Sequence, residues 1–545
     1  MRVPRIEDLR PSRLPANALA AIVGAGSAVL LMLRLFVPRP VGVADNYDGA
    51  RLMCHLGVDV RVPTGAPRLR DYVNVHYYHL AHYSCHQHVL GSIKLPDVPY
   101  RSSQLLLLYA GRVLTRVLGL ASYLDLRAVG IVCCVLIGAA MGLLYRFVRL
   151  RHRYRLALCV AVVLVVADTV FIDYAISPFS EIASTIGLLY VAVGVVMLAG
   201  PGRRVQWAGL VLTGVAGVFF ATAKTQNYPA VLPLAVVLLM PALPVPVARL
   251  RGVDRRLRHR LAGLATVAVL VVGAAVVSGN EDQKTAQLTG ANFVTVTLLP
   301  TGSHPVQDLT ELGGPVWLSE YAGAPPWCAP WKLQNSATYK EFAKSLSHKK
   351  ILGFLLRHPG RVLPVMNNVA EYFYVPRATS TLCAPGPNNI QRMVTPRLAN
   401  YTRIGHTPRG LLDKRWVPIT DAVGLLRGGG LATLVALWLV PGIAVFATRR
   451  RRAMRSVGTV VALLVTVAVA QFVASAFADG IDTAKHLNLA VFATALAWVF
   501  AAVEVLVALI TKRGAPSAGA VADSPATVAR EEAVSGAVSE AEATG

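Results

Sequence analysis

The sequence is poor in charged residues, and poorest in acidic ones. Only 15% of its 545 residues are Asp, Glu, Lys or Arg, whereas soluble domains carry about 25%. This low share excludes an ordinary soluble enzyme, and a hydrophobic content of 54% excludes disordered and collagen-like chains. The 29 acidic residues stand against 54 basic ones, which gives a net charge of +25. A basic excess can indicate nucleic-acid binding, but here short basic runs separate long apolar stretches, so no nucleic-acid partner is expected.

Motifs that bind soluble nucleotides are also missing. The sequence contains no Walker-type phosphate loop, no Gly-rich dinucleotide signature and no zinc-protease motif. This absence disfavours a nucleotide-driven pump.

Long apolar runs dominate the sequence. A helix needs roughly 17–25 apolar residues to cross a bilayer, and we therefore predict an all-α polytopic membrane protein of about ten transmembrane helices. The expected spans are 16–38, 127–148, 155–175, 182–200, 206–223, 229–249, 261–279, 429–448, 456–478 and 487–511.

The basic runs predict the orientation. Arg-rich runs precede the first span, fill every second connector and follow the last span, so they share one side if the spans are correct. The positive-inside rule makes that side cytoplasmic, which predicts a plasma-membrane protein with both termini in the cytoplasm. The predicted parts are a cytoplasmic N-terminus (1–15), a first membrane part (16–279) with a long outer loop (39–126), a small extracytoplasmic domain (280–428), a second membrane part (429–511) and a disordered cytoplasmic tail (512–545).

Cysteine positions fit this sidedness. Three of the seven cysteines lie inside expected spans, and the other four lie in the two outer parts, two in each. An oxidising compartment favours disulfides, and the simplest pairs are Cys54–Cys85 and Cys328–Cys383. Unpaired thiols remain the alternative.

Two carboxylates follow the first expected span. Asp45 and Asp48 are three residues apart, and Arg51 comes shortly after them. Next to a membrane end, such a carboxylate could remove the proton from an attacking hydroxyl of a lipid-borne substrate. The pair could equally cap the helix that follows.

Further ionisable residues gather at the outer ends of other expected spans. Asp168 and Asp173 lie in the third span and Glu181 follows it. Charged groups inside a membrane are costly and usually face a cavity or a partner. Asp168 could also serve helix packing alone.

Cations occur at the outer boundary, against the positive-inside trend. Lys224 and Gln226 follow the fifth span, and Lys485 with His486 lies between the ninth and tenth. An ammonium there suits a lipid phosphate, because it can offset the charge of a departing oxyanion. Alternatively, each lysine only extends toward lipid headgroups.

Two shorter patterns predict local structure. Histidines recur from His76 to His88 with interleaved tyrosines, which suits an interfacial helix better than a metal site. The stretch 349–359 has the pattern of an amphipathic helix ended by proline.

Several of these motifs, in order, resemble the GT-C class of membrane glycosyltransferases, and more closely the bacterial glycan hexosyltransferases of the WsfD type. The opening Asp45-Asn46-Tyr47-Asp48 with Arg51-Leu52-Met53 is similar to the acidic opening of that group. The other matching motifs are Tyr174 with Ser177-Pro178-Phe179-Ser180-Glu181, Lys224-Thr225-Gln226, Arg357-His358-Pro359 and Lys485-His486-Leu487.

The resemblance implies a GT-C-like fold and a polyprenyl-phosphate-linked sugar as donor. The acceptor would be a glycan or a lipid-linked saccharide, and the reaction a single displacement with inversion. Asp45 or Asp48 would be the base, with Asp45 favoured, and Asp173 would orient the sugar or a metal. A divalent cation is compatible with the class, and the sequence leaves the metal open. The residues implied for substrate and lipid-phosphate binding are Arg51, Glu181, Lys224, Gln226, Lys485 and His486.

Other functions remain open at this stage. A lipid-linked glycan polymerase or ligase would use the same outer residues, and only its substrates would differ. A transporter of lipid-linked glycans should have polar residues through the depth of several spans, whereas here they cluster at outer ends. A membrane scaffold would give no reason for carboxylates and cations to share one side.

Overall fold

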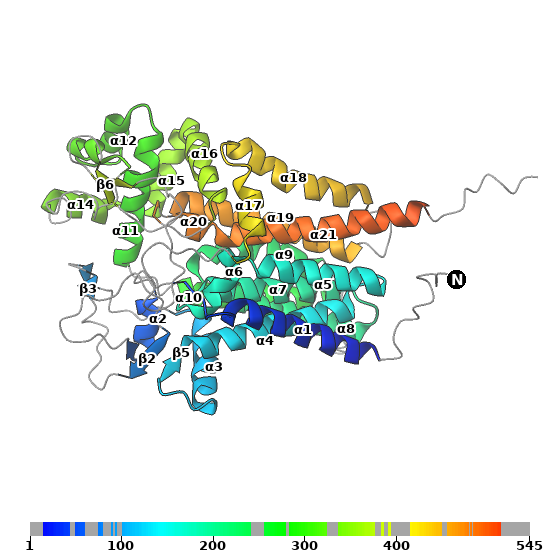
Figure 1. Ribbon diagram of the computed structural model, residues 1–545. Helices are drawn as coiled ribbons and strands as arrows, with labels where there is room; N and C mark the ends of the chain where they lie inside the picture. Colours follow the sequence, from blue (N-terminus) through cyan, green and yellow to red (C-terminus); the bar gives the residue numbers. More distant parts are fainter. Residues whose placement is uncertain are drawn as a thin grey trace, which may run out of the picture.

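The computed structural model is built almost entirely of helices (Figure 1). It describes residues 15–43, 49–59, 75–79, 89–90, 93–94, 101–240, 255–278, 283–323, 336–376, 383–385, 391–393, 415–448, 455–478, 480–481 and 483–513.

Within these residues, seven helices are long and apolar enough to cross a membrane. They coincide with seven of the expected spans and confirm a predominantly α-helical, multi-pass membrane protein. The seven helices are α1 (Ala16–Phe36), α4 (Leu126–Phe147), α7 (Glu181–Leu198), α8 (Arg203–Ala221), α18 (Gly430–Thr448), α19 (Arg455–Ala478) and α21 (Asn488–Arg513).

The third expected span is broken. Helix α5 (His152–Val166) is followed by α6 (Thr169–Ile172) and the 3₁₀ turn η3 (Asp173–Ile176), and the two parts meet at an angle of 66°. The span expected over 155–175 is therefore bent within its length and is not one straight helix. The reason is Asp168, which has an extended backbone and caps α6 by accepting the amide of Val170 at 3.1 Å.

The sixth and seventh expected spans are shorter apolar helices in the described residues. The 3₁₀ turn η4 (Thr225–Ala230) leads into α9 (Val231–Leu239), and α10 (Arg255–Ser278) follows. Pro229 lies inside η4, and because proline lacks an N–H it cannot supply a regular helical bond there. The apolar lengths, Thr225–Leu239 and Arg260–Val276, fall short of the seven longer helices.

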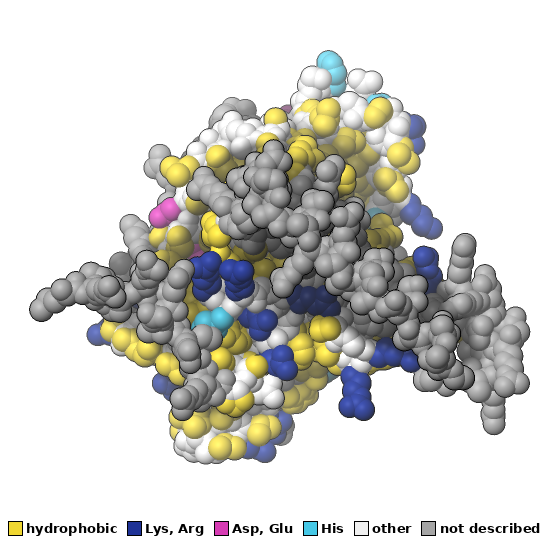
Figure 2. Space-filling model, turned by 90° about the vertical axis from the view of Figure 1, so that its right-hand side faces the viewer, with side chains coloured by type: hydrophobic (Ala, Val, Ile, Leu, Met, Phe, Trp, Pro, Cys, Tyr) yellow, Lys and Arg dark blue, Asp and Glu magenta, His cyan; other side chains and the backbone are white. Residues whose placement is uncertain are grey.

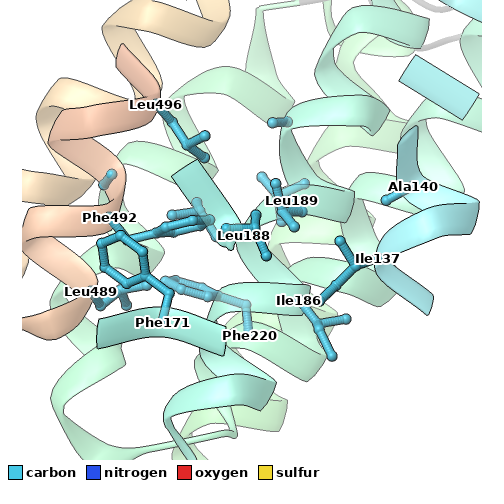
Figure 3. Close-up of a cluster of buried hydrophobic side chains, with 14 of the residues drawn as sticks. Ile137, Ala140, Phe171, Ile186, Leu188, Leu189, Phe220, Leu489, Phe492 and Leu496 are labelled. Carbon is cyan, nitrogen blue, oxygen red and sulfur yellow. The ribbon is translucent and has the colours of Figure 1, made fainter. Parts of the chain in front are cut away.

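Small residues bring the helices close together. A Cβ at Gly138 in α4 would lie 2.5 Å from the carbonyl oxygen of Gly24 in α1, so the two backbones touch, as small residues allow in membrane helix pairs. Aromatic and aliphatic side chains of several helices, among them α4, α6, α7 and α8, then pack together in the core (Figure 3). There the rings of Phe171 in α6 and Phe492 in α21 meet edge to face, 4.9 Å apart.

The long helices run side by side, and the chain enters and leaves the bundle at one end (Figure 1). Figure 2 looks onto this end, where Lys and Arg side chains gather. Exposed arginines here include Arg149, Arg151, Arg203 and Arg204. We call it the basic end, and the other the opposite end.

Between α1 and α4 the chain forms small elements at the opposite end. They are α2 (Ala50–His55), α3 (Gln104–Val117), and the strands β1 (Val58–Asp59), β2 (His76–His79), β3 (Val89–Leu90), β4 (Ile93–Lys94) and β5 (Leu124–Asp125). The strands pair antiparallel in the order β1-β2-β5, with His76 opposite Asp125, and β3 pairs with β4. His76–His79 is therefore a strand, and the helix that the histidine spacing predicted is wrong there. The reason is the pairing with β1 and β5, which a local spacing pattern does not contain.

The later polar part contributes short helices with a second hydrophobic core, which includes Phe293, Leu309, Phe342 and Phe354. The amphipathic helix expected over 349–359 is confirmed as α15, whose apolar face packs into this core. The boundaries proposed for a domain over 280–428 remain a prediction. The elements are α11 (Gln283–Asn292), η5 (Phe293–Leu298), η6 (Leu299–Thr301), α12 (Pro305–Glu311), η7 (Val316–Tyr321), α14 (Ala337–Ser345), α15 (His348–Arg357), η8 (Pro359–Arg361), α16 (Val362–Phe373), β6 (Cys383–Pro385) paired with β7 (Gln391–Met393), and α17 (Pro418–Gly424).

Candidate functional site

The polar region at the opposite end of the bundle includes the break in the third span. A broken helix leaves carbonyls without their usual partners. The indole of Trp416 donates to the carbonyl of Leu164 at 2.9 Å, and Arg34 of α1 donates to that of Ala167 at 3.1 Å. These two carbonyls at the break are therefore paired within the protein.

Asp168 serves packing at this break. Its fully buried carboxylate accepts the backbone amides of Ile419 and Thr420 and the hydroxyl of Thr420, at 2.8 to 3.1 Å. With the cap on Val170, both oxygens are fully used. Of the two interpretations that the sequence left open, the structure supports the structural one.

Asp173 is held by a cation from α1. Its carboxylate, fully buried, lies 3.5 Å from the guanidinium of Arg34, which also donates to the hydroxyl of Thr169 at 3.0 Å. Among the described residues no group of three or more His, Cys, Asp or Glu side chains is arranged to hold a metal ion.

Side chains from three different connections between the long helices meet in one buried polar cluster. The ammonium of Lys224, after α8, donates to the carboxylate of Glu181, the first residue of α7, at 2.7 Å. The same ammonium lies 3.3 Å from Nδ1 of His486, in the short helix α20 (Thr483–His486) that precedes α21. Oε1 of Gln226 lies 3.0 Å from that ring nitrogen. We call these four residues the Lys224 cluster.

The cluster is well buried, and side chains of α19 hold its backbone in place. The side chains of Glu181 and Lys224 are only 5% and 15% exposed. Gln471 of α19 donates to the backbone carbonyl of Gln226 at 3.0 Å, and Ser475 donates to that of His486 at 3.1 Å. Lysine and glutamate are therefore held in place before any ligand arrives, which is the preorganisation that an electrostatic site needs.

His486 is an uncharged member of the cluster. Burial holds the pKa of its ring well below the usual range, and the positive charges of Lys224 and Lys485 lower it further. The ring is thus neutral at physiological pH. It can bind by hydrogen bonds, whereas the charge that attracts a phosphate comes from the lysines.

Lys485 adds a second buried cation. Its ammonium lies 4.8 Å from the centre of the Phe179 ring, and the residue is 4% exposed. Phe179 belongs to the turn between η3 and α7, where its amide donates to the hydroxyl of Ser177 at 3.0 Å. Among these described residues, two lysines and one glutamate, with a neutral histidine, leave one excess positive charge.

The chain reaches this region directly after α1. A Cβ at Gly42 would lie 2.0 Å from the carbonyl oxygen of Ile176, so only glycine allows this contact with the end of η3. Asp45 and Asp48, two and five residues after the buried Val43, lie outside the described residues. Arg51 lies half-buried in α2.

Cys54 in α2 is disulfide-bonded, which fits the oxidising compartment expected for this part of the chain. Its expected partner Cys85, and Cys328, lie outside the described residues, and of Cys383 only the strand is described. Both proposed pairings remain predictions.

The sequence missed two polar residues that hold this region together. Gln471 fixes the Lys224 cluster through the carbonyl of Gln226, and Arg34 pairs with Asp173. Arg34 and Gln471 lie inside apolar runs, and a lone polar residue in a predicted span is the signal that could have found them. The carboxylates of Glu181 and Asp173 are each paired with a cation of the chain. The sugar or metal contacts that the resemblance implies for them remain predictions.

A search of curated proteins found no match. The model of one protein family, described as the YfdI N-terminal transmembrane domain, matches residues 6–521. Because this match covers nearly the whole sequence and all seven long helices, the chain belongs to the YfdI N-terminal transmembrane domain family.

Proposed function

We propose that this protein is a membrane glycosyltransferase that moves a hexose from a polyprenyl-phosphate donor to a glycan or lipid-linked acceptor. The observation that carries the proposal is the buried Lys224 cluster at the end of a membrane bundle. A polyprenyl phosphate presents its charged group at that depth, so two preorganised lysines could meet it without a soluble cofactor. The family match is compatible with this activity.

The chemistry follows from the charges. In the proposed step an acceptor hydroxyl attacks the anomeric carbon, the bond from that carbon to the phosphate oxygen breaks, and the configuration inverts. The bonding electrons pass to the phosphate, which gains one negative charge, while the hydroxyl proton passes to Asp45 or Asp48. Lys224 and Lys485 would stabilise the departing phosphate, since ammonium groups act strongly in a poorly solvated site.

The other cluster members would support this step. Glu181 would hold the ammonium of Lys224 in place and limit the positive charge, and Gln226 and neutral His486 would bind by hydrogen bonds. Arg51 would add a third cation. The proposed active face is the opposite end, because the positive-inside rule predicts that the basic end faces the cytoplasm and the opposite end faces the outside of the cell.

The test uses membranes that contain the full chain. They receive polyprenyl-phosphate glucose, galactose or mannose with a radiolabelled sugar, and a lipid extract of the host as acceptor source. Wild type should transfer label, and Asp45→Asn or Asp48→Asn should lower the rate by about 10²–10⁴-fold, as expected for loss of a general base. The exposed Lys340→Met is the matched control and should transfer normally. If Asp45→Asn and Asp48→Asn both transfer label at the wild-type rate, the assignment of the base is refuted.

A polymerase or ligase is the second outcome of this test. It would show no transfer from the single-sugar donors but would join lipid-linked oligosaccharides supplied as both donor and acceptor.

A further inference from the structure

The first turn of α3 contains a buried amide with unused hydrogen-bonding groups. Gln104 is completely buried, and neither the nitrogen nor the oxygen of its side-chain amide has a hydrogen-bond partner in the structure. Most buried polar groups are paired, and a buried unpaired amide destabilises a protein. A leucine of similar size would avoid that loss, so the amide calls for an explanation beyond packing.

The position of Gln104 ties it to the Lys224 cluster. The residue before it, Ser103, donates its amide to the carbonyl of Thr222 at 3.1 Å, and the hydroxyl of Ser102 donates to the carbonyl of Ala223 at 2.7 Å. Lys224 directly follows Ala223 in the chain. The start of α3 is thus fastened to the segment that presents the Lys224 ammonium.

The helix turns this amide inward. Gln104 shares the buried face of α3 with Leu107, Leu108 and Gly111, and a Cβ at Gly111 would meet the Val129 side chain of α4 at 2.3 Å. Gln104 therefore lies on the face of α3 that packs against the bundle, where α3 contacts both α4 and α7.

We propose that Gln104 is a specificity-determining residue that binds hydroxyl groups of the hexose; this assignment rests on the proposed function. An amide offers two donors and an acceptor, and a sugar hydroxyl is both donor and acceptor. A hexose whose phosphate lies at Lys224 could therefore satisfy both sides of the amide. A site built to pair a substrate hydroxyl rejects an analogue that lacks it, because the protein group is then left unpaired.

The experiment compares Gln104→Leu with Gln471→Leu in the full chain, purified in lipid nanodiscs. Gln471 is equally buried but donates to the carbonyl of Gln226. Without donor, Gln104→Leu should melt at or above the wild-type temperature, because it removes an unpaired amide, whereas Gln471→Leu should melt lower. With polyprenyl-phosphate hexose, the melting temperature should rise more in wild type than in Gln104→Leu. Transfer by Gln104→Leu should fall by about tenfold or more.

Monodeoxy donors give the decisive comparison. Wild type should discriminate strongly against one of them, and Gln104→Leu should discriminate much less. If Gln104→Leu melts well below wild type, or keeps the wild-type donor response and discrimination, the amide is paired internally, for example by a buried water. The role assigned to Gln104 is then overturned, while the proposed function stands. If wild type itself neither responds to the donors nor transfers them, the proposed function fails, and the hexose fails with it as the ligand of Gln104.

Discussion

Removing the charge of Lys224 should damage both the stability and the activity of the protein, and the two effects can be separated. In Lys224→Met the carboxylate of Glu181, 5% exposed, loses the ammonium that lies 2.7 Å away. Breaking a buried ion pair by removing one partner costs about 3–5 kcal/mol, chiefly because a charge is left buried and unpaired. We expect about 3 kcal/mol here, since the side chain of Lys224 keeps some contact with solvent at 15% exposure.

The double variant Glu181→Gln/Lys224→Met separates the two effects. It leaves no unpaired charge, so thermal unfolding in nanodiscs should recover much of the loss seen in the single variant. Hexose transfer should stay lost, because the phosphate still lacks its ammonium. Lys340→Met removes an exposed lysine and should change neither quantity.

Two results would refute this reasoning. If Lys224→Met unfolds at the wild-type temperature, the pair with Glu181 does not stabilise the fold. If the stable double variant transfers hexose at the wild-type rate, Lys224 has no role in phosphate binding.

Three further predictions concern the fold. Asp168→Ala should lower the free energy of unfolding by at least about 3 kcal/mol, because several buried donors lose their acceptor, and should therefore lower the melting temperature, yet keep wild-type transfer per folded molecule; a near-normal melting temperature would contradict its structural role. Gly138→Leu should separate α4 from Gly24 of α1 and lower the yield of folded protein on size-exclusion chromatography, whereas normal yield would refute the close backbone contact. Arg357 holds the pKa of Glu311 below its ordinary 4.5, so the carboxylate stabilises the fold above that pH and loses its effect as the pH falls through the folded pKa; the melting difference between wild type and Glu311→Gln should shrink on acidification, and a constant difference would contradict the pairing.

Residue patterns predicted the fold class well. Apolar length alone located the seven long helices, because a bilayer requires that length of any spanning helix. The break at Asp168 was not predicted, since it depends on amides of α17 that are distant in the sequence. The strand that begins at His76 was not predicted either, because strand pairing is also a long-range interaction.

The site was predicted in part. Position at the end of a span marked Glu181, Lys224 and His486 as candidates, and the structure brings these three together. The sequence could not reveal that Glu181 pairs with Lys224, because the two lie 43 positions apart and meet only when α7 packs on α8. Nor could it reveal the unpaired amide of Gln104, since pairing is a property of the folded surroundings.

The most direct test of the central claim is turnover by the purified chain in proteoliposomes. The liposomes contain polyprenyl phosphate carrying a radiolabelled hexose, together with lipid-linked saccharide as acceptor. We predict that label appears in the acceptor, that an equal amount of free polyprenyl phosphate is formed, and that both depend on Lys224. Label that crosses the bilayer still attached to its polyprenyl phosphate, with no free polyprenyl phosphate formed, would contradict a glycosyltransferase and identify a transporter.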